Sequence, residues 1–297
     1  MTKGNHYVKL DDRGVLAISG DDRVTFLQGL VSNNVELVSD RRCIYAAFLT
    51  PQGKFLCDFI ISTDGVRLLL ECDLVVLEIF KKKLQLYKLR SKVELLDVSD
   101  EFAIYAGYGD TIHSALGLAK NLGDVTPFLG GIAMVDPRLS EMGVRVLCLE
   151  SNSLEVEGVT EGSKNDYDYM RIKLGVPDGS RDMQMEKTIL LEAGFDELNG
   201  VDWNKGCYMG QELTARTKYR GLIKRRFMPV NVLGPLPKSG TLIMFGEREA
   251  GEIRTGFGDI AMALIRLNAF EECLQVGGEL FADKTVVVPQ KQEWMNF

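Results

Sequence analysis

Residues 205–212 read Lys-Gly-Cys-Tyr-Met-Gly-Gln-Glu, and this octapeptide is the most distinctive stretch of the 297-residue chain. Gly206 and Gly210 stand four residues apart around the cysteine, and glycine lets a backbone take positive φ or approach a neighbour closely. Lys205 precedes Cys207 by two positions, and its positive charge favours a thiolate. The octapeptide therefore predicts a reactive thiol or, as the plainer alternative, a buried and inert cysteine in a turn that opens a helix.

The spacing of the octapeptide differs from that of common catalytic motifs. A nucleophile elbow centres its nucleophile between two glycines, whereas Cys207 comes one place early and the spacer is one residue longer. His6 and His113, the two histidines of the chain, offer no well-placed base. No GxGxxG or Walker loop occurs, since Gly256 and Gly258 lack a third glycine. Hydrolase, nicotinamide-dependent and nucleotide-hydrolysing functions are therefore not expected.

A cationic segment follows the octapeptide. Residues 216–226 hold six lysines or arginines and no acid, in a chain whose net charge is −7. The negative total argues against a general nucleic-acid binder, whose footprint is usually basic. The segment is either a solvated turn between two elements or a local anion site that a small polyanion could enter.

Composition sets the broad class of the protein. Apolar residues make up 45% and charged residues 26% of the chain, which is ordinary for a globular protein of about two domains. No apolar run reaches the ~20 residues of a membrane span. Residues 1–14 have no apolar signal core and carry acids too early for a transit peptide. We therefore expect a cytoplasmic protein that binds neither nucleic acid nor membrane.

The cysteines are scattered, without CxxC or another short regular spacing. Such spacing in an intracellular chain predicts reduced thiols in place of a disulfide framework. With so few histidines and no HExxH-type ligand pair, no metal site is predicted. The six positions are Cys43, Cys57, Cys72, Cys148, Cys207 and Cys273.

Apolar periodicity predicts mixed strands and helices before residue 226. Pro51 and Gly53 separate the apolar runs 44–49 and 55–62, a pattern typical of a β-hairpin. Residues 73–86 have the periodicity of a helix. Further helices are predicted at 112–121 and 166–174, and further strands at 8–19 (two short strands around a turn), 66–71, 93–98, 102–108, 132–136 and 144–149. Because strands and helices do not alternate regularly, the pattern favours an α+β domain over a doubly wound sheet.

The character of the sequence changes after residue 226. Short apolar segments separated by Gly, Pro and Asn indicate a small β-barrel. These segments are 227–233, 240–245, 251–255, 261–267 and 279–288. We therefore predict an α+β domain over residues 1–226 and a C-terminal β-barrel domain over residues 227–297.

The octapeptide and the ARTKYRG that follows it resemble the defining motif of the YgfZ-type folate-binding proteins. These proteins are related to the glycine-cleavage T-protein, an aminomethyltransferase. Other segments resemble family segments in the expected order, namely DDRVTFLQGLVSNNV (21–35), FLTPQGKFLCDFII (48–61), MRIKLGVPDG (170–179) and GEIRTG (251–256). The resemblance covers most of the chain and implies a T-protein-like folate-binding α+β domain followed by a small C-terminal β-barrel.

The resemblance also implies a function and a set of site residues. It implies an accessory protein that binds tetrahydrofolate, or a one-carbon derivative of it, and acts in assembling or repairing iron–sulfur clusters of target enzymes. Its partners would be folate and iron–sulfur client or assembly proteins, and its functional thiol would be Cys207, with Lys205 beside it. Folate contacts are implied at Asp58, Arg171, Glu192, Tyr208, Gln211, Glu212, Arg216 and Lys218.

Two departures separate the chain from aminomethyltransferases. Where those enzymes carry two consecutive aspartates, this chain has Cys57 before Asp58, and a thiol replaces a carboxylate at neutral pH only if its pKa is strongly lowered. Their Arg-x-Glu-x-Gly element also appears with Lys173 in place of the acid. A folate-dependent aminomethyl- or methyltransferase is therefore the alternative function, and a module without ligand is a third. Asp58 either hydrogen-bonds a pterin or is a solvent-facing strand residue.

Overall fold

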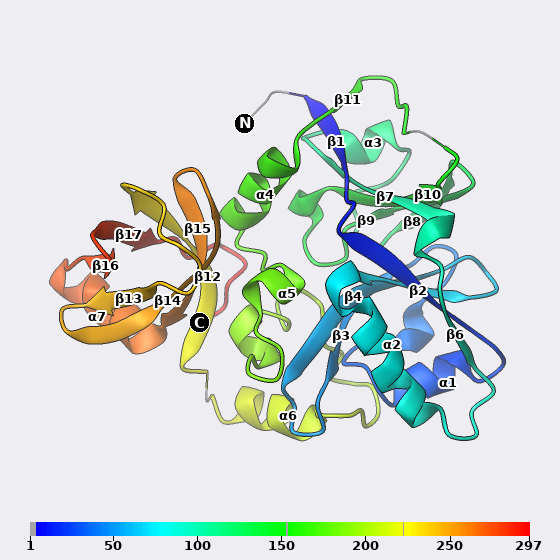
Figure 1. Cartoon of the computed structure of the whole chain (residues 1–297), viewed down its shortest axis with the longest axis horizontal. Helices are drawn as coiled ribbons and strands as arrows, with labels where there is room; N and C mark the ends of the chain where they lie inside the picture. Colours follow the sequence, from blue (N-terminus) through cyan, green and yellow to red (C-terminus); the bar gives the residue numbers. More distant parts are fainter. Residues whose placement is uncertain (1–3, 153, 222) are drawn as a thin grey trace. The chain divides into compact units, whose positions relative to one another are not determined.

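The computed structural model describes residues 4–152, 154–221 and 223–297, which form two compact units (Figure 1). Unit 1 comprises Met1–Tyr167 and Leu198–Gln211, and unit 2 comprises Asp168–Glu197 and Glu212–Phe297. The chain therefore passes from one unit to the other three times. Within the described ranges, no helix has both the length and the apolar character needed to cross a membrane.

The first sheet of unit 1 is antiparallel and has the strand order β3-β4-β5-β2-β6. The predicted hairpin is confirmed, because β3 and β4 pair with Tyr45 opposite Ile60. The strands are β2 (Arg13–Ser19), β3 (Ile44–Leu49), β4 (Phe55–Thr63), β5 (Leu68–Asp73) and β6 (Glu94–Asp97).

The second sheet of unit 1 has the order β11-β1-β7-β10-β9-β8. Its pairings are antiparallel except that β1 and β11 run parallel. The strands are β1 (Asn5–Lys9), β7 (Phe102–Tyr108), β8 (Val125–Phe128), β9 (Gly131–Val135), β10 (Val144–Leu149) and β11 (Val159–Glu161).

Helix α2 (Leu74–Lys88) covers one face of the first sheet (Figure 1). Its N-terminus is capped by Asp73, whose side chain accepts a hydrogen bond from the backbone N–H of Val75. The ring of Phe80 stacks on that of Phe59 at 4.9 Å between centroids, and it also meets Phe48 at 5.5 Å. This aromatic contact fixes the helix to β3 and β4.

On the opposite face of the first sheet, charged side chains point into the interior of unit 1 and are buried. Side chains alternate along a strand, so Asp58 points away from the face on which Phe59 meets α2. Glu71 pairs with Ile60 and therefore lies on the same face as Asp58. Arg145 of β10 contacts Glu71, which places the second sheet over this polar face.

Shorter elements complete unit 1, and two of the sequence predictions differ from them. The helix predicted at 112–121 ends at Ala115, shortly before Gly117 takes positive φ. For residues 216–226 a solvated turn was one of the two predictions, but residues 216–219 belong to helix α6 and residues 225–226 to strand β12. The shorter elements are α1 (Arg23–Gln28), η1 (Val35–Leu37), η2 (Ser99–Glu101), α3 (Ile112–Ala115) and η3 (Ser140–Met142), and α4 (Lys164–Lys173) and α6 (Gln211–Tyr219) span the junctions between the units.

Unit 2 contains a closed barrel with the strand order β12-β15-β14-β13-β16-β17. The strand pairing thus confirms the C-terminal barrel that the sequence predicted. The strands are β12 (Arg225–Leu233), β13 (Leu242–Phe245), β14 (Arg248–Phe257), β15 (Ile260–Arg266), β16 (Leu280–Ala282) and β17 (Thr285–Pro289), and the helices of the unit are α5 (Gly179–Asp182), η4 (Leu190–Ala193) and α7 (Leu267–Val276).

Unit 2 also includes residues that precede the barrel in the sequence. Trp294 donates its indole N–H to the carbonyl of Leu174 at 2.8 Å, and a guanidinium nitrogen of Arg226 donates to the carbonyl of Leu191 at 2.9 Å. Compactness therefore groups Asp168–Glu197 with the barrel. The division into residues 1–226 and 227–297 stays a prediction based on sequence character.

Candidate functional site

Cys207 lies in the loop of unit 1 that leads to α6, and its side chain is exposed. Gly210 in the same loop takes φ +82°, and a Cβ added there would lie 2.7 Å from the carbonyl oxygen of Thr50. Only glycine fits such a conformation and such a close approach. The loop therefore packs against the β3–β4 turn and presents Cys207 to solvent, so the prediction of a buried cysteine is wrong.

Lys205 anchors this loop to residues 31–33. Its side chain is buried, and the ammonium donates hydrogen bonds of 2.7 Å to the carbonyls of Val31 and Asn33. The ammonium also lies 5.3 Å from the centre of the Tyr208 ring, within the range of a cation–π contact. Burial lowers the pKa of Lys205 to about 8. These contacts make Lys205 a residue that positions the thiol-bearing loop.

Polar side chains of residues 31–34 hold the same loop, and sequence reasoning did not assign them a role. The hydroxyl of Ser32 donates a hydrogen bond of 2.6 Å to the carbonyl of Gly200. The backbone carbonyl of Ser32 accepts one of 3.1 Å from the N–H of Asp202. The amide of Asn33 donates to the carbonyl of Asn199 at 2.8 Å. A Ser-Asn-Asn run that directly follows an apolar segment is the signal that could have identified them.

Tyr208 and Gln211, which the resemblance implies as folate contacts, belong to the Cys207 loop, and both contribute to its structure. Tyr208 is buried beneath Lys205, and its carbonyl accepts a hydrogen bond of 3.2 Å from the backbone N–H of Gln211. Gln211 begins α6 and is partly exposed. Four of the predicted site residues thus lie on one anchored loop.

Asp58 lies in the interior of unit 1, so a solvent-facing position is excluded. One carboxylate oxygen accepts a hydrogen bond of 2.7 Å from the hydroxyl of Tyr45. Burial, together with the charge of Asp58, raises the pKa of Tyr45 well above its usual value. The Tyr45 ring in turn has the guanidinium of Arg138 at 5.7 Å from its centre. Asp58 is therefore one end of a larger buried network.

The rest of this network consists of ion pairs in the interior of unit 1, and the contact of Arg145 with Glu71 joins the two sheets. Arg138 forms a bidentate pair with Asp136, with hydrogen bonds of 2.9 and 2.7 Å. Arg145 lies 4.0 Å from Asp136 and 3.6 Å from Glu71, and Arg13 is paired with Glu71. Burial alone would raise the pKa of Glu71, but Arg13 and Arg145 outweigh it and hold that pKa below its usual value.

The network has hydrogen-bonding capacity that the described residues do not fill. Oε2 of Glu71 and both Nε and Nη1 of Arg145 are buried and have no hydrogen-bond partner among those residues. Buried polar atoms without partners cost free energy, so these two side chains keep one acceptor and two donors that the described residues do not satisfy. Sequence alone missed this set, because Arg13 and Arg145 look like ordinary surface cations.

Arg171 and Glu192 lie in unit 2 and are both engaged in ion pairs. Arg171 is buried and donates to the carboxylate of Asp182, the hydroxyl of Thr255 and a backbone carbonyl, at 2.8 to 2.9 Å. Glu192 pairs with Arg225 at 2.8 Å. These bonds give both residues a structural role within unit 2.

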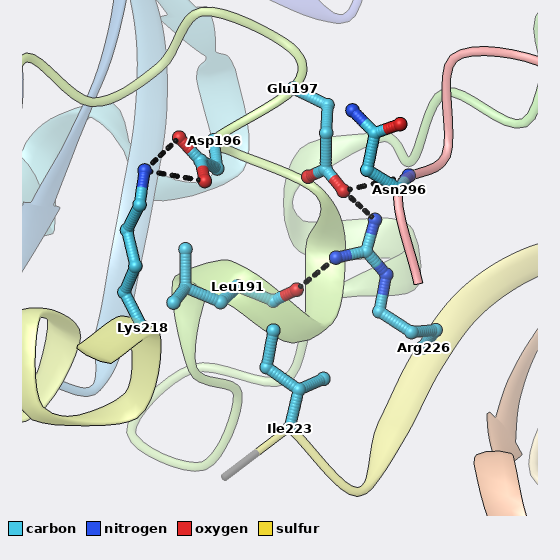
Figure 2. Close-up of a pocket in the computed structure, with 7 residues that line it drawn as sticks. All are labelled: Leu191, Asp196, Glu197, Lys218, Ile223, Arg226 and Asn296. Carbon is cyan, nitrogen blue, oxygen red and sulfur yellow. Dashed lines mark hydrogen bonds and ion pairs between the residues drawn. The ribbon is translucent and has the colours of Figure 1, made fainter. Parts of the chain in front are cut away.

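Lys218, Arg216 and Glu212 lie on the part of α6 that belongs to unit 2. Figure 2 shows the ammonium of Lys218 facing both carboxylate oxygens of Asp196, at 3.1 and 2.9 Å, across a pocket of about 340 Å³. Arg226 lies on another wall of that pocket and pairs with Glu197 at 2.7 Å. The side chains of Arg216 and Glu212 are exposed.

The predicted site residues therefore fall into separate groups. The loop group of unit 1 consists of Lys205, Cys207, Tyr208 and Gln211, and Asp58 belongs to the buried network of the same unit. Among the described residues, no group of three or more His, Cys, Asp or Glu could hold a metal ion. The remaining predicted contacts belong to unit 2, namely Arg171, Glu192, Glu212, Arg216 and Lys218.

Comparison with solved structures defines the class of the fold. The crystal structure of glycine cleavage system aminomethyltransferase T from Bartonella henselae matches with a TM-score of 0.78, at 15% identity, over 99% of this chain and 87% of that chain. A sequence model described as "CAF17, C-terminal beta-barrel domain" matches residues 224–297. The protein thus has the fold of an aminomethyltransferase T-protein, as predicted, with a CAF17-type barrel at its C-terminus.

Sequence relatives define the family. The human protein named iron-sulfur cluster assembly factor IBA57, mitochondrial, is 35% identical over 277 residues, which are 86% of this chain and 76% of the human protein. Its Mus musculus counterpart is 34% identical over 294 residues, or 90% of this chain and 79% of the mouse protein. The chain belongs to the family of the iron-sulfur cluster assembly factor IBA57.

The relatives also overturn one prediction. We expected a cytoplasmic protein from the composition of residues 1–14, but the relatives from Homo sapiens, Mus musculus and Dictyostelium discoideum are all named as mitochondrial proteins. The expectation of a cytoplasmic location is therefore wrong, because the composition of a short terminal stretch does not decide the compartment.

Proposed function

We propose that this protein is a mitochondrial iron–sulfur cluster assembly factor that acts through the thiol of Cys207 and binds a tetrahydrofolate in unit 1. The observation that carries the proposal is the contrast among the cysteines of unit 1. Cys207 is exposed on a loop that Lys205 anchors, whereas the other four cysteines of the unit are buried. The YgfZ-type resemblance of the octapeptide adds support.

The thiol suits the handling of clusters because cysteine thiolates are the usual ligands of iron–sulfur clusters. A cluster needs about four such ligands, and Cys207 is one exposed thiol without a metal-binding group around it in the described residues. A cluster that meets Cys207 therefore takes its other ligands from a second molecule. This requirement is consistent with an accessory protein that works with client or assembly proteins.

Complementation of depleted cells tests the role of the thiol. Cys207→Ser should fail to restore the activities of mitochondrial iron–sulfur enzymes, and its melting temperature should stay within a few degrees of wild type because the side chain is exposed. Cys273→Ser, which alters a partly exposed cysteine of the barrel unit, is the matched control and should complement fully. Full complementation by Cys207→Ser would show that the thiol is not needed.

The buried network of unit 1 is the proposed site of the pterin ring, because it contains Asp58, which the resemblance implies as a folate contact. A pterin ring carries donors and acceptors side by side, and the network offers the acceptor atom Oε2 of Glu71 and the donor atoms of Arg145. Asp58 would orient the ring through its carboxylate. When bound, tetrahydrofolate would supply one-carbon chemistry, and these residues would bind and orient it.

Calorimetric titration with tetrahydrofolate tests this part of the proposal. Saturable binding is expected for wild type, and Asp58→Asn should weaken it by about tenfold because it loses a charged acceptor (~1.4 kcal/mol). The exposed Asp11→Asn, in the same unit, is the control and should leave the affinity unchanged. The absence of saturable binding to the wild-type protein would remove folate from the proposal without affecting the role of Cys207.

The resemblance also implies Arg216 and Lys218 of α6 as folate contacts, and cations of this kind suit the carboxylates of a glutamyl tail. Arg216 is exposed there, while Lys218 shares its charge with Asp196. Polyglutamylated folate should therefore bind more tightly than monoglutamate at low salt, and Arg216→Ala should reduce that difference. The ion pairs of Arg171 and Glu192 favour a structural role for these two residues. Glu212, Tyr208 and Gln211 remain proposed folate contacts. Equal affinity for the two folates would contradict the tail assignment.

A folate-dependent aminomethyltransferase is the second candidate, and Cys57 speaks against it. Burial raises the pKa of Cys57 well above its usual value, with Cys72 and Asp58 adding to the effect. The residue is therefore a neutral thiol where an aminomethyltransferase has a carboxylate. Mixed with an aminomethylated carrier protein and tetrahydrofolate, the protein should form no methylenetetrahydrofolate above background. Robust turnover in that assay would make the transferase the better assignment.

A further inference from the structure

Helix α2 carries a second apolar stripe on the side that faces away from its sheet. The stripe consists of Val75, Ile79, Lys82, Leu86 and the C-cap residue Leu89, which are spaced four, three, four and three residues apart. Its aliphatic members are strongly exposed, at 78% for Val75, 47% for Ile79, 75% for Leu86 and 88% for Leu89. We refer to these five residues as the outer stripe.

The fold of unit 1 does not need the outer stripe. The helix is fixed by its inner face, where Val76, Leu77, Phe80 and Leu84 are buried and the Phe80 ring stacks on Phe59. Single exposed aliphatic residues are ordinary on a protein surface, but four exposed aliphatic residues along one side of a helix indicate an interaction site.

The surroundings of the outer stripe are strongly basic. Residues 81–92 contain six cations and no acid, in a chain whose net charge is −7. Glu78 is the acid that precedes them on the helix, and it pairs with Lys82 at 3.2 Å on the exposed surface. Such an exposed pair contributes little to stability, because solvent screens both charges. A partner that brings its own acids could therefore replace Glu78 at little cost.

The backbone at the end of the stripe is strained. Leu89 has φ 44° and ψ −109°, a conformation that leucine rarely adopts. It lies beside a shallow hollow of about 710 Å³ that is also lined by Asp22, Arg90 and Ser91. Strained residues persist where the surrounding structure holds them and are frequent at binding sites. Here the strained residue is a leucine that is almost fully exposed to solvent next to a concave surface.

We propose that the outer stripe of α2 binds an acidic amphipathic helix of a partner protein. The alternation of four and three residues is the seam along which two helices pack knobs into holes. Lys82 stands in the middle of the seam and selects an acid on the facing helix. A second copy of α2 would bring two basic flanks together, and a lipid interior would receive Lys82 among its apolar contacts, so both fit less well.

A designed peptide tests the proposal directly. The probe is a fluorescein-labelled three-heptad peptide with leucine at the seam, one central seam glutamate and glutamates on the flanks, which repel each other and disfavour self-association. Wild type should bind it saturably in fluorescence anisotropy, more weakly as salt is raised. The double variant Ile79→Ser/Leu86→Ser should bind at least ~10-fold more weakly, which corresponds to ~1.4 kcal/mol.

Two further variants separate specific docking from general stickiness. Val66→Ser removes an aliphatic side chain that is 71% exposed on the β4–β5 turn of the same unit, and it should leave binding unchanged. The Lys82→Glu variant should bind the probe more weakly than wild type does. It should bind a second peptide, in which lysine replaces the central seam glutamate, more tightly than wild type does. All variants should melt within a few degrees of wild type, because the substituted side chains are exposed.

The opposite results would overturn the proposal. The proposal is contradicted if wild type does not bind the probe saturably, or if the double variant binds it as tightly as wild type does. Vesicles of equal parts phosphatidylcholine and phosphatidylserine test the membrane alternative. If wild type co-sediments with them and the double variant does not, the stripe binds a membrane instead. A dimer in sedimentation velocity that the double variant dissolves would assign it to a second copy of the chain. None of these results depends on Cys207 or on folate.

Discussion

Two cysteines of unit 1 show how position decides the chemistry of a side chain. Cys57 lies on β4, is buried, and has a pKa that burial raises well above the usual value. Cys207 lies on a loop, is exposed, and is held there by Gly210 and Lys205. The two residues have the same functional group, but the strand removes it from solvent and the loop presents it.

The contrast separates the two cysteine motifs in the way that the proposed function requires. The position of Cys57 corresponds to the acid of the aminomethyltransferases, and the structure gives it no means of ionising. The octapeptide around Cys207 instead builds an anchored and accessible thiol.

Thiol reactivity should show the largest difference between the two positions. In the native protein, iodoacetamide should label Cys207 at least ~100-fold faster than Cys57, because alkylation needs an accessible thiolate. Cys273, whose pKa burial raises, should react at an intermediate rate. Peptide mapping by mass spectrometry over time measures all three rates. Equal protection of Cys207 and Cys57 would contradict the contrast drawn here.

Introducing a carboxylate should separate the two positions next most strongly. Cys57→Asp buries a charge without a prepared partner and should lower the free energy of unfolding by ~3–5 kcal/mol. Cys207→Asp, at the exposed position, should change it by less than ~0.5 kcal/mol. Urea denaturation of both variants measures this difference. Cys57→Asp should also remain inactive in aminomethyl transfer, because Lys173 still differs from the acid of those enzymes.

The anchoring of the loop can be weakened without touching the thiol. Lys205→Met removes the hydrogen bonds to Val31 and Asn33 and should lower the free energy of unfolding by ~1–3 kcal/mol. It should also reduce complementation although Cys207 is intact. Lys238→Met, at an exposed lysine of the barrel, is the control and should be neutral in both measurements. A neutral Lys205→Met would show that the ammonium does not position the loop.

The last prediction concerns the pH dependence of the free energy of unfolding. The pKa of Lys205 is about 8 in the folded protein, compared with 10.5 for an ordinary lysine. Between these values the unfolded chain binds more protons than the folded one, so Lys205 should make stability rise with pH from 8 to 10.5. Denaturation at several pH values should show this rise in wild type relative to Lys205→Met. A constant difference between the two proteins would contradict the lowered pKa.

The elements of the fold were largely predictable because their signals are local. Pro51 and Gly53 mark the hairpin between β3 and β4, and the strand predicted at residues 102–108 coincides with β7. The helix predicted at 112–121 failed because its apolar residues pack as irregular chain after Ala115. The arrangement into two separate sheets depends on contacts between distant strands, and no local pattern specifies those contacts.

The site was predictable only where it lies within one stretch of sequence. The octapeptide identified Cys207 and the residues beside it, and the structure places them on one loop. The partners that anchor the loop come from residues 31–34, and the buried network joins Arg13, Glu71 and Arg145 from three distant strands. Charged residues of that kind have the same composition as surface residues, so sequence does not reveal that they are buried.

The three crossings of the chain between the units have a consequence for dissecting the protein. Unit 2 is built from two separate stretches, and bonds such as that from Arg171 to Thr255 join them. A gene fragment that ends before the barrel would lack Thr255 and would leave the buried Arg171 without one of its acceptors. Proteolytic nicking near residue 224 should therefore yield two pieces that remain associated, whereas either piece expressed alone would be incomplete.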